Sequence, residues 1–272
     1  MLQRSVFDEL VRFVAATLPE LDAITLGRQR HVAIGTKPDG SDVTAADRAA
    51  ERLLRQRIRT AWPRDGILGE EYGGAIEPRG RTWLIDPIDG TASYVLGLGT
   101  FGTLLALVVD GEPVFGCIHL PAMRETTYAG NGRGCWLRRG SGRARRVRVA
   151  SQRSLAKASV GLTSFKASDL SRRPGPWRIS ALARAVGRVR LVGDCVQYAL
   201  LCRGELDAAI DPRMSAWDIA PLVVCVREAG GAIGDLAGRT SGLLHASSLV
   251  AASSTGLRRA ICATLSAPRV SR

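Results

Sequence analysis

The stretch WLIDPIDGT, residues 83–91, carries the pattern from which the rest of the chain is interpreted. Its apolar run 83–85 predicts a buried strand that delivers the carboxyl group of Asp86 at its end. Pro87 cannot donate to a β-ladder, so we expect the ladder to break there and a tight turn to bring Asp89 back to the same side. Two carboxylates on one turn repel each other unless a cation lies between them. Oxygen ligands of this kind suit Mg²⁺ or Mn²⁺ better than Zn²⁺.

The same segment offers further groups for phosphate chemistry. The peptide carbonyl of Ile88 could complete a set of metal ligands, and the amides of Gly90 and Thr91 can point at a phosphate. The Thr91 hydroxyl is then placed to hold a water beside the metal. The alternative is a strand-ending turn with a capping aspartate. Two further acidic clusters, at 69–71 (GEE) and 217–218 (WD), favour the metal site over that alternative.

A competing phosphatase chemistry uses an aspartate nucleophile in a D-x-D-G-T pattern. Here the pattern is D-x-x-D-G-T, because Ile88 lengthens the spacing between Asp86 and Asp89 by one residue. That spacing no longer puts a nucleophile and a general acid on one face of an extended chain. The sequence therefore predicts hydrolysis by a metal-activated water and not through an aspartyl-phosphate.

The N-terminal half predicts two helices followed by a largely antiparallel sheet. Apolar residues recur at helical spacing over 6–18, and a second helix, capped by Thr44 with Asp47 at its third position, is expected to end at Pro63. Asp110-Gly111 is typical of a tight hairpin between two apolar strands. The strands expected here cover 67–70, 83–86, 101–109, 114–119, 128–129, 135–137 and 147–149.

After about residue 150 strands and helices alternate, which indicates a layered α/β unit. Strands are expected at 159–162, 189–192, 208–210 and 249–252, and helices at 179–186, 195–203, 218–229 and 255–265. We expect two lobes that share an interface: 1–149, carrying most of the metal ligands, and 150–272, supplying Asp218 and the contacts to the leaving group.

Composition excludes several classes of protein. The 272 residues are 46% hydrophobic and 23% charged, so most of the chain is expected to fold around a core. No run approaches the roughly 18 apolar residues of a membrane span, and acidic residues interrupt the N-terminal apolar pattern, which indicates an amphipathic helix and not a signal peptide. The six cysteines form no C-x-x-C pair, so we expect reduced, buried thiols and a cytoplasmic protein without a membrane partner.

The chain is strongly basic, with a formal net charge of +13. Such a surface attracts phosphorylated metabolites and, as an alternative, nucleic acid. The densest run of arginines, in 138–148, is interrupted by Gly-Ser-Gly and is not interleaved with aromatic residues. We therefore expect a solvated hairpin tip there and no nucleic-acid partner.

Taken together, the motifs resemble those of the inositol monophosphatase family. The resemblance rests on GEE at 69–71, WLIDPIDGT at 83–91, WDIA at 217–220 and EAGG at 228–231, and it extends to Lys37, Asp42-Val43-Thr44 and Asp47. It implies an α+β or α/β chain with the layered α-β-α-β-α sugar-phosphatase fold, usually assembled as a homodimer. It also implies a lithium-sensitive phosphomonoesterase that uses Mg²⁺, in two or three ions, with Mn²⁺ as a substitute.

The resemblance also implies roles for individual residues. It gives metal ligation to Glu70, Asp86, the Ile88 carbonyl, Asp89 and Asp218. Activation of the attacking water is implied for Thr91, with Glu70 and Asp47 nearby. The Trp217 ring would form a wall of the site. The implied substrate contacts are Glu70, Asp89, Gly90, Thr91, Ser93 and Asp218. Asp194 and Asp211 are added from their places in the sequence, since Asp194 leads into a predicted helix and Asp211 precedes Asp218 by seven residues.

The leaving group is expected to depend on Asp194 and Asp211. Two carboxylates near a neutral polyol are costly, whereas an amino alcohol phosphate supplies a cation between them. Ser93 stands where many members of the family have asparagine, and together with 101–107 and 193–200 it resembles the histidinol-phosphatase branch.

The expected substrate is therefore L-histidinol phosphate. Inositol 1-phosphate and a 3′,5′-bisphosphonucleotide are the alternatives. A helix cap is the alternative role of Asp194. The non-enzymatic alternatives are a basic nucleic-acid-binding protein on a phosphatase fold and a regulatory protein that binds inositol phosphates without hydrolysing them.

Overall fold

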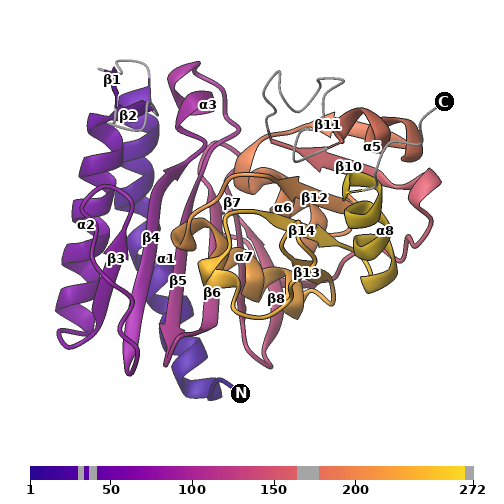
Figure 1. Cartoon of the computed structure of the whole chain (residues 1–272). Coiled ribbons are helices and arrows are strands. Elements are labelled where there is room, and N and C mark those ends of the chain that lie inside the picture. The colour runs from indigo at the N-terminus through magenta and orange to yellow at the C-terminus, as the bar shows by residue number, and fades with distance from the viewer. Residues whose placement is uncertain (30–33, 37–41, 164–177, 267–272) are drawn as a thin grey trace.

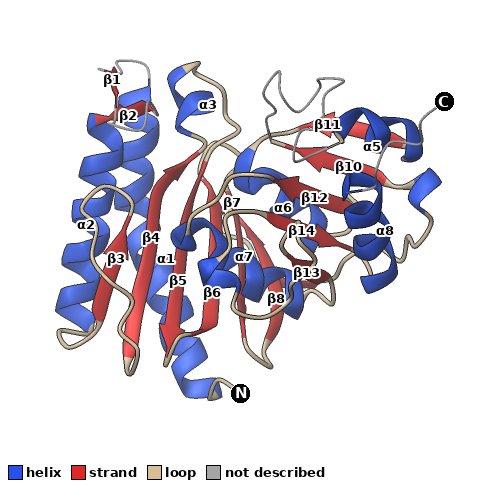
Figure 2. Cartoon of the chain, viewed as in Figure 1, coloured by secondary structure: helices blue, strands red, loops and turns tan. Residues whose placement is uncertain are grey.

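Two β-sheets alternate with three layers of helices in the computed structural model, which describes residues 1–29, 34–36, 42–163 and 178–266 (Figure 1). One sheet has seven strands and the other has five. A small hairpin of β1 (Ile34–Thr36) and β2 (Asp42–Thr44) precedes the second helix. Figure 2 shows helices on the outer side of each sheet and between the two. This is the α-β-α-β-α arrangement that the family resemblance implies, so that expectation is confirmed.

The first helical layer consists of α1 (Arg4–Arg28) and α2 (Ala45–Ala61), which cover one face of the seven-stranded sheet. Leu10 of α1 and Ile58 of α2 are fully buried against Trp83 and Phe115 of the sheet. The predicted capping box is present, since Thr44 and Asp47 exchange hydrogen bonds at the start of α2. The helix ends two residues before Pro63, as the position of that proline predicts.

The seven-stranded sheet has the order β3-β4-β5-β6-β7-β8-β9. Strands β3 and β4 are parallel, and every later pair is antiparallel. The predicted hairpin is confirmed at Asp110 and Gly111, whose φ angles of 51° and 79° match a two-residue turn that favours glycine. The strands are β3 (Gly66–Gly69), β4 (Arg81–Asp89), β5 (Gly102–Val109), β6 (Glu112–Leu120), β7 (Glu125–Gly130), β8 (Gly134–Arg139) and β9 (Arg145–Val147).

The predicted break of the ladder at Pro87 is present, since no pair with β5 is formed between Asp86 and Asp89, but the prediction that the strand ends there is wrong. The strand continues to Asp89, and its register against β5 shifts between Asp86 and Asp89. The Pro87 carbonyl accepts a hydrogen bond of 2.7 Å from the Thr103 hydroxyl of β5, which holds the irregular segment to the sheet. A β-bulge thus tolerates the missing N–H of proline and redirects the side chains around it.

The five-stranded sheet has the order β11-β10-β12-β14-β13 and is mixed. The predicted alternation of strands and helices is confirmed, with ends that differ by a residue or two. One short strand, β13, was not predicted, because Ala232–Gly234 is too short to show a period. The elements are β10 (Ser159–Leu162), α5 (Ile179–Ala185), β11 (Arg188–Leu191), α6 (Asp194–Cys202), β12 (Ala208–Asp211), α7 (Ala216–Glu228), β13 (Ala232–Gly234), β14 (Leu249–Ala252) and α8 (Thr255–Ser266).

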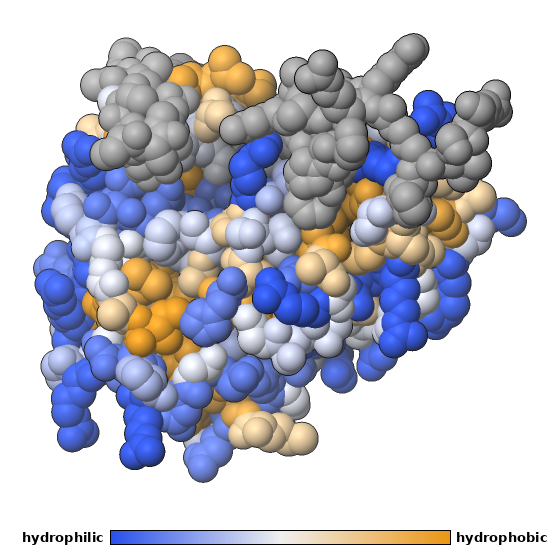
Figure 3. All heavy atoms as spheres, in the orientation of Figure 1, coloured by the Kyte–Doolittle hydropathy of each residue, from blue (hydrophilic) through white to orange (hydrophobic). Residues whose placement is uncertain are grey.

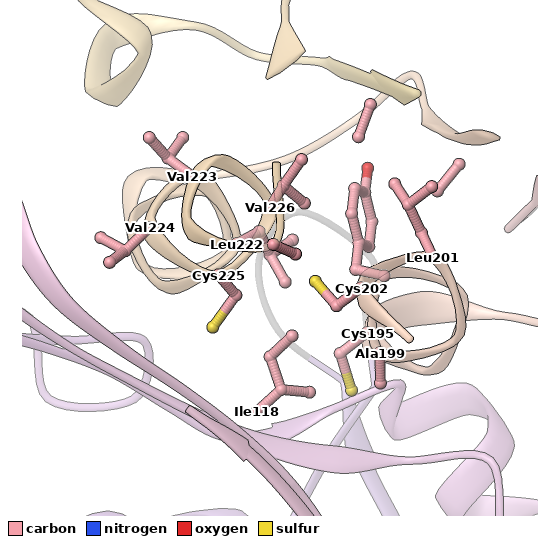
Figure 4. Close-up of a cluster of buried hydrophobic side chains, with 14 of the residues drawn as sticks. Ile118, Cys195, Ala199, Leu201, Cys202, Leu222, Val223, Val224, Cys225 and Val226 are labelled. Atoms are coloured by element: carbon pink, nitrogen blue, oxygen red, sulfur yellow. The ribbon is translucent and has the colours of Figure 1, made fainter. Parts of the chain in front are cut away.

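Helices α6 and α7 form the central layer, and their side chains join the two sheets in one apolar cluster. Figure 4 shows Ile118 of β6 beneath these helices, with Leu222 and Cys225 of α7 and Cys202 of α6 around the same space. The last layer, α5 and α8, packs on the other face of the five-stranded sheet. Because both halves of the chain contribute to the central cluster, they share an interface; a boundary near residue 149 stays a prediction.

The exposed arginine-rich hairpin and the free cysteines match what the sequence predicts. The arginine-rich run forms the β8–β9 hairpin, where Arg143, Arg145 and Arg146 are exposed. Hydrophilic side chains cover much of the face in Figure 3, with apolar areas between them. All six cysteines lie in the described part of the chain and are free, and five of them are buried. Among the described helices, none combines the length and the apolar character needed to cross a bilayer.

The close approach of β6 and α7 at Gly116 gives a testable prediction. A Cβ at this position would lie 2.4 Å from the Pro221 carbonyl oxygen, so a methyl group must displace the backbone of α7. We expect Gly116→Ala to lower the free energy of unfolding by about 2 kcal/mol in urea titrations. Gly27→Ala is the control, because that helical position has no atom within 4 Å and should gain up to about 1 kcal/mol. Equal midpoints for Gly116→Ala and the wild type would contradict this packing argument.

Candidate active site

A cavity of about 550 Å³ lies where the end of β4 faces the start of α7. Leu84 of β4 and Ala220 of α7 belong to one apolar cluster, so the cavity joins residues that are more than a hundred positions apart in the sequence. Its lining is polar on one side and includes most of the predicted site residues. The lining residues are Glu70, Asp86, Ile88, Asp89, Gly90, Thr91, Pro212, Arg213, Met214, Ser215, Trp217, Asp218 and Ser247.

Three of the predicted metal ligands converge in this cavity. Asp86, Asp89 and Asp218 each place one carboxylate oxygen within 4.8 Å of the others. Backbone amides fix all three carboxylates: the N–H of Ile88 donates to Asp86 at 3.0 Å, that of Cys195 to Asp89 at 2.5 Å, and that of Ser215 to Asp218 at 2.7 Å. The side chains are therefore held in place by the main chain before any ligand binds.

The electrostatics of this cluster favour a cation. Burial, followed by the charges of Glu70, Asp89 and Asp218, raises the pKa of Asp86 well above its ordinary value. Burial and the neighbouring carboxylates likewise raise the pKa of Asp89, and that of Asp218 to about 7. Carboxylates that repel each other at close range, with oxygen as the donor atom throughout, match the ligand preference of Mg²⁺. The residues present thus fit a divalent cation.

Glu70 approaches the cluster from the loop that follows β3. Its N–H donates to the Ile85 carbonyl at 3.1 Å, which ties this loop to β4 one residue before Asp86. Glu70 lines the cavity, and its charge contributes to the raised pKa values of Asp86 and Asp218. The structure therefore brings together the four carboxylates that the family resemblance assigns to the metal.

Thr91 and Asp47 meet beside the cluster. The Thr91 hydroxyl lies 3.1 Å from the Ile88 carbonyl oxygen and 3.4 Å from Asp47 Oδ1. Asp47 is fully buried in the first turn of α2, and this burial raises the pKa of its carboxyl group. Because the hydroxyl hydrogen can point to either acceptor, the lone pairs of the Thr91 oxygen remain available to a water molecule in the cavity.

Gly90 leaves room for Asp194 above the start of the short helix α3 (Thr91–Val95). Its φ of 86° suits glycine, and a Cβ there would lie 2.5 Å from Asp194 Oδ2. Ser93 Oγ is 3.5 Å from the same Asp194 oxygen. Burial raises the pKa of Asp194 to about 6. The alternative role of Asp194 as a helix cap is wrong, because Gly193 is the N-cap of α6 and no side chain caps that helix.

Asp211, like Asp194 and Ser93, is not among the residues that line the cavity. It is buried at the end of β12, where Thr163 Oγ1 donates to one carboxylate oxygen at 2.8 Å and the Arg213 N–H to the other at 3.2 Å. Burial raises its pKa to about 6. Its predicted direct contact with the leaving group thus lacks support from the described residues. Lys37 lies outside the described part of the chain, and of Asp42 only the backbone, in β2, is described.

The sequence did not single out Arg213, Met214 or Ser247. Arg213 is exposed at the cavity and adds a positive charge opposite the carboxylates, and Met214 is tied to Ser247 by an N–H to carbonyl bond of 2.9 Å. Arg213 could have been noticed from its place between two acidic residues, Asp211 and Asp218. Ser247 sits in an irregular segment before β14, and no local pattern marks it.

Comparison with known proteins agrees with this geometry. Residues 11–268 match the model of the inositol monophosphatase family. The histidinol-phosphatase of Mycobacterium tuberculosis is 40% identical over 223 residues, covering 78% of this chain and 85% of that protein. The histidinol-phosphatase of Chlorobaculum parvum is 34% identical over 235 residues, covering 86% of this chain and 88% of that protein.

A solved structure shows that the likeness extends to the whole fold. The inositol monophosphatase of Thermotoga maritima superimposes with a TM-score of 0.83 at 28% sequence identity, covering 94% of this chain and 96% of that chain. Sequence motifs, layered fold and acidic cavity thus lead to one conclusion. This chain belongs to the inositol monophosphatase family, and it is a phosphoric monoester hydrolase of a class of metal-dependent phosphatases that act on small phosphorylated metabolites.

Proposed function

We propose that the chain hydrolyses L-histidinol phosphate to histidinol and phosphate with the help of Mg²⁺. The observation that carries the proposal is the convergence of Asp86, Asp89 and Asp218 on one cavity that Glu70 and Thr91 also line. The name of the Mycobacterium tuberculosis relative, at 40% identity, supports the choice of substrate. A homodimer in the cytoplasm that binds no nucleic acid stays the accompanying prediction.

The metal would be held by five groups of this chain: Glu70, Asp86, the Ile88 carbonyl, Asp89 and Asp218. We propose two or three Mg²⁺ ions there, with Mn²⁺ able to replace them. A bound divalent cation supplies Lewis-acid chemistry, since it lowers the pKa of a water molecule and offsets the charge of phosphate oxygens. The protein contributes the fixed carboxylates, whose orientation depends on the amides of Ile88, Cys195 and Ser215.

Thr91 and Glu70 would orient the attacking water. The Thr91 oxygen can accept one hydrogen of the water while its own hydrogen is engaged by Asp47 or the Ile88 carbonyl. Glu70, which lines the same cavity, can accept the other. Asp47 acts through Thr91, and its fixed position in the first turn of α2 keeps the hydroxyl aimed at the cavity. Two acceptors at fixed angles hold the water for in-line attack on phosphorus.

Asp194 would provide the selectivity for an amino alcohol. Its carboxylate lies against Gly90, a residue that lines the cavity, although Asp194 itself is not among the lining residues. The ammonium group of histidinol phosphate could pair with this carboxylate, whereas a neutral polyol would gain hydrogen bonds alone. Ser93, at 3.5 Å, would orient Asp194. Inositol 1-phosphate remains the second candidate substrate, favoured by the likeness to the Thermotoga maritima structure.

The metal assignment predicts the effect of one isosteric change. Asp86→Asn keeps an oxygen that can accept from the Ile88 N–H but removes a ligand charge. We expect kcat for phosphate release to fall by at least about 100-fold at saturating Mg²⁺ while the circular dichroism spectrum is retained. EDTA should abolish wild-type activity, and Mg²⁺ should restore it. Near-native turnover by Asp86→Asn would refute the assignment.

Repulsion in the carboxylate cluster predicts a pH dependence of stability without metal. Burial, backed by neighbouring charge, raises the pKa of Asp218 from 3.8 in the unfolded chain to about 7 in the folded protein. The folded protein binds this proton more tightly than the unfolded chain does. The stability that the proton provides is therefore full below pH 3.8 and is lost as the pH rises through about 7, where Asp218 ionises in the folded protein. In EDTA, Asp218→Asn should be increasingly more stable than the wild type between pH 5 and pH 8. A stability difference that does not change over this range would show that Asp218 bears no such penalty.

The amine hypothesis predicts how selectivity changes. Asp194→Ala should lower kcat/KM for L-histidinol phosphate by about 10- to 100-fold, the loss expected for one charge-assisted contact. The same variant should change kcat/KM for myo-inositol 1-phosphate much less, because that substrate has no cation. Initial rates of phosphate release with both substrates test this directly. A wild-type preference for inositol phosphate that persists in Asp194→Ala would overturn the amine argument.

A further inference from the structure

A buried glutamate of helix α2 holds the loop that carries Glu70. Glu51 has no solvent-exposed surface, although its side chain is a carboxyl group, and it does not line the cavity. Its Oε2 accepts the Glu71 N–H at 2.7 Å, and its Oε1 accepts the Tyr72 N–H at 3.3 Å. Two backbone N–H groups of one short loop thus donate to the same buried carboxylate. This attachment is strong, because hydrogen bonds to a charged acceptor are stronger than hydrogen bonds between neutral groups.

Gly69, the residue before Glu70, leaves space for this carboxylate because it has no side chain. A Cβ at Gly69 would lie 2.1 Å from Glu51 Oε1, so no larger side chain fits between the loop and α2. The Gly69 N–H donates to the Gly73 carbonyl at 3.1 Å, which closes the loop on itself. The Glu51 carboxylate thus touches the residues on both sides of Glu70, namely Gly69 and Glu71.

Two arginines of α2 hold the same loop. Arg55 donates to the Gly73 carbonyl and, through Nε at 2.7 Å, to Glu51. Arg52 donates to the Tyr72 hydroxyl. Arg55 is largely buried, with 12% of its side chain exposed, so its pair with Glu51 is shielded from solvent. Helix α2 is therefore the base on which the loop 69–73 is fixed (Figure 1).

The same helix fixes the other residue that we assign to the water. Asp47 and Glu51 lie one turn apart on α2, and both are fully buried. Asp47 contacts Thr91, and Glu51 contacts the loop of Glu70. A single rigid element thus sets the distance between Thr91 and Glu70. We propose that Glu51 is a positioning residue for Glu70, an inference that rests on the proposed role of Glu70 in the active site.

The test is a double-mutant cycle with Glu51→Gln and Glu70→Gln. Glutamine keeps the shape of Glu51, but it loses the charge and turns an N–H₂ group toward one of the donors. We expect Glu51→Gln to lower kcat about 10- to 100-fold with little change in KM, and to weaken Mn²⁺ binding measured by electron paramagnetic resonance. In the double variant, kcat should fall no further than in Glu70→Gln, because Glu51 acts through Glu70.

Glu125→Gln is the matched control for lost stability. Glu125 is also a buried glutamate paired with arginines, Arg139 at 2.8 Å and Arg203, but it lies on β7 away from the cavity. The Glu125→Gln variant should have a lower unfolding midpoint than the wild type, while its kcat and Mn²⁺ affinity stay at the wild-type values. Should Glu51→Gln fail to fold, Gly69→Ala is the second variant, because its methyl group displaces the Glu51 carboxylate without removing it.

The outcomes separate the two levels of the proposal. The positioning role would be overturned if the losses of kcat in the double variant were multiplicative. It would also be overturned if Glu51→Gln, or Gly69→Ala where that variant is needed, bound Mn²⁺ with wild-type affinity. Wild-type Mn²⁺ affinity and kcat in Glu70→Gln would instead contradict the proposed function of Glu70 itself. A fall of kcat without loss of Mn²⁺ binding in Glu51→Gln would also contradict the inference, since Glu70 is proposed to bind the metal.

Discussion

Mutual repulsion among carboxylates that are forced into one partly buried cavity is the constraint on which the site depends. Asp86, Asp89 and Asp218 have oxygens within 4.8 Å of one another, and burial raises the pKa of each. Such a cluster opposes folding at neutral pH unless the surrounding structure holds it. The apolar cluster between the two sheets provides that support, because it contains α6 and α7 and packs them against β6.

The supporting contacts come from the main chain more than from other side chains. Amide donors from Ile88, Cys195 and Ser215 fix the three aspartates, and each donor belongs to a different segment of the fold. Cys195 is instructive, because its backbone N–H and its buried thiol both hydrogen-bond Asp89. Hydrogen bonds to a charged acceptor favour the ionised carboxylate that a cation requires, and they counteract part of the effect of burial on the pKa.

Helix α2 and the bulge in β4 divide the positioning between them. The bulge places Asp86 and Asp89 on the same side of the sheet edge despite a spacing of three residues, which a regular strand would direct to opposite faces. The helix reaches the site from the other side through two buried carboxylates, Asp47 and Glu51. Residues that never contact a substrate thus determine how accurately the groups around the cavity are aligned.

The two carboxylates expected near the leaving group have different surroundings in the structure. Asp194 and Asp211 were expected to share one pocket, and the charge of Asp194 contributes to the raised pKa of Asp211. Asp194 stands over Gly90, whereas Asp211 is hydrogen-bonded to Thr163 and the Arg213 N–H. A carboxylate whose oxygens already have partners gains less from a ligand. Selectivity for an amine would therefore depend on Asp194 much more than on Asp211.

Most of the fold and the acidic residues of the site could be predicted from the sequence alone, because they have local causes. Apolar periodicity determined the helices, Asp110-Gly111 determined a hairpin, and Thr44 with Asp47 determined the start of α2. Tertiary structure alone decided that β4 continues past Pro87, that Asp211 is hydrogen-bonded to Thr163 and the Arg213 N–H, and that Glu51 holds the loop of Glu70. These features depend on contacts between segments far apart in the chain, such as Gly69 against Glu51, and no local pattern of residues records such a contact.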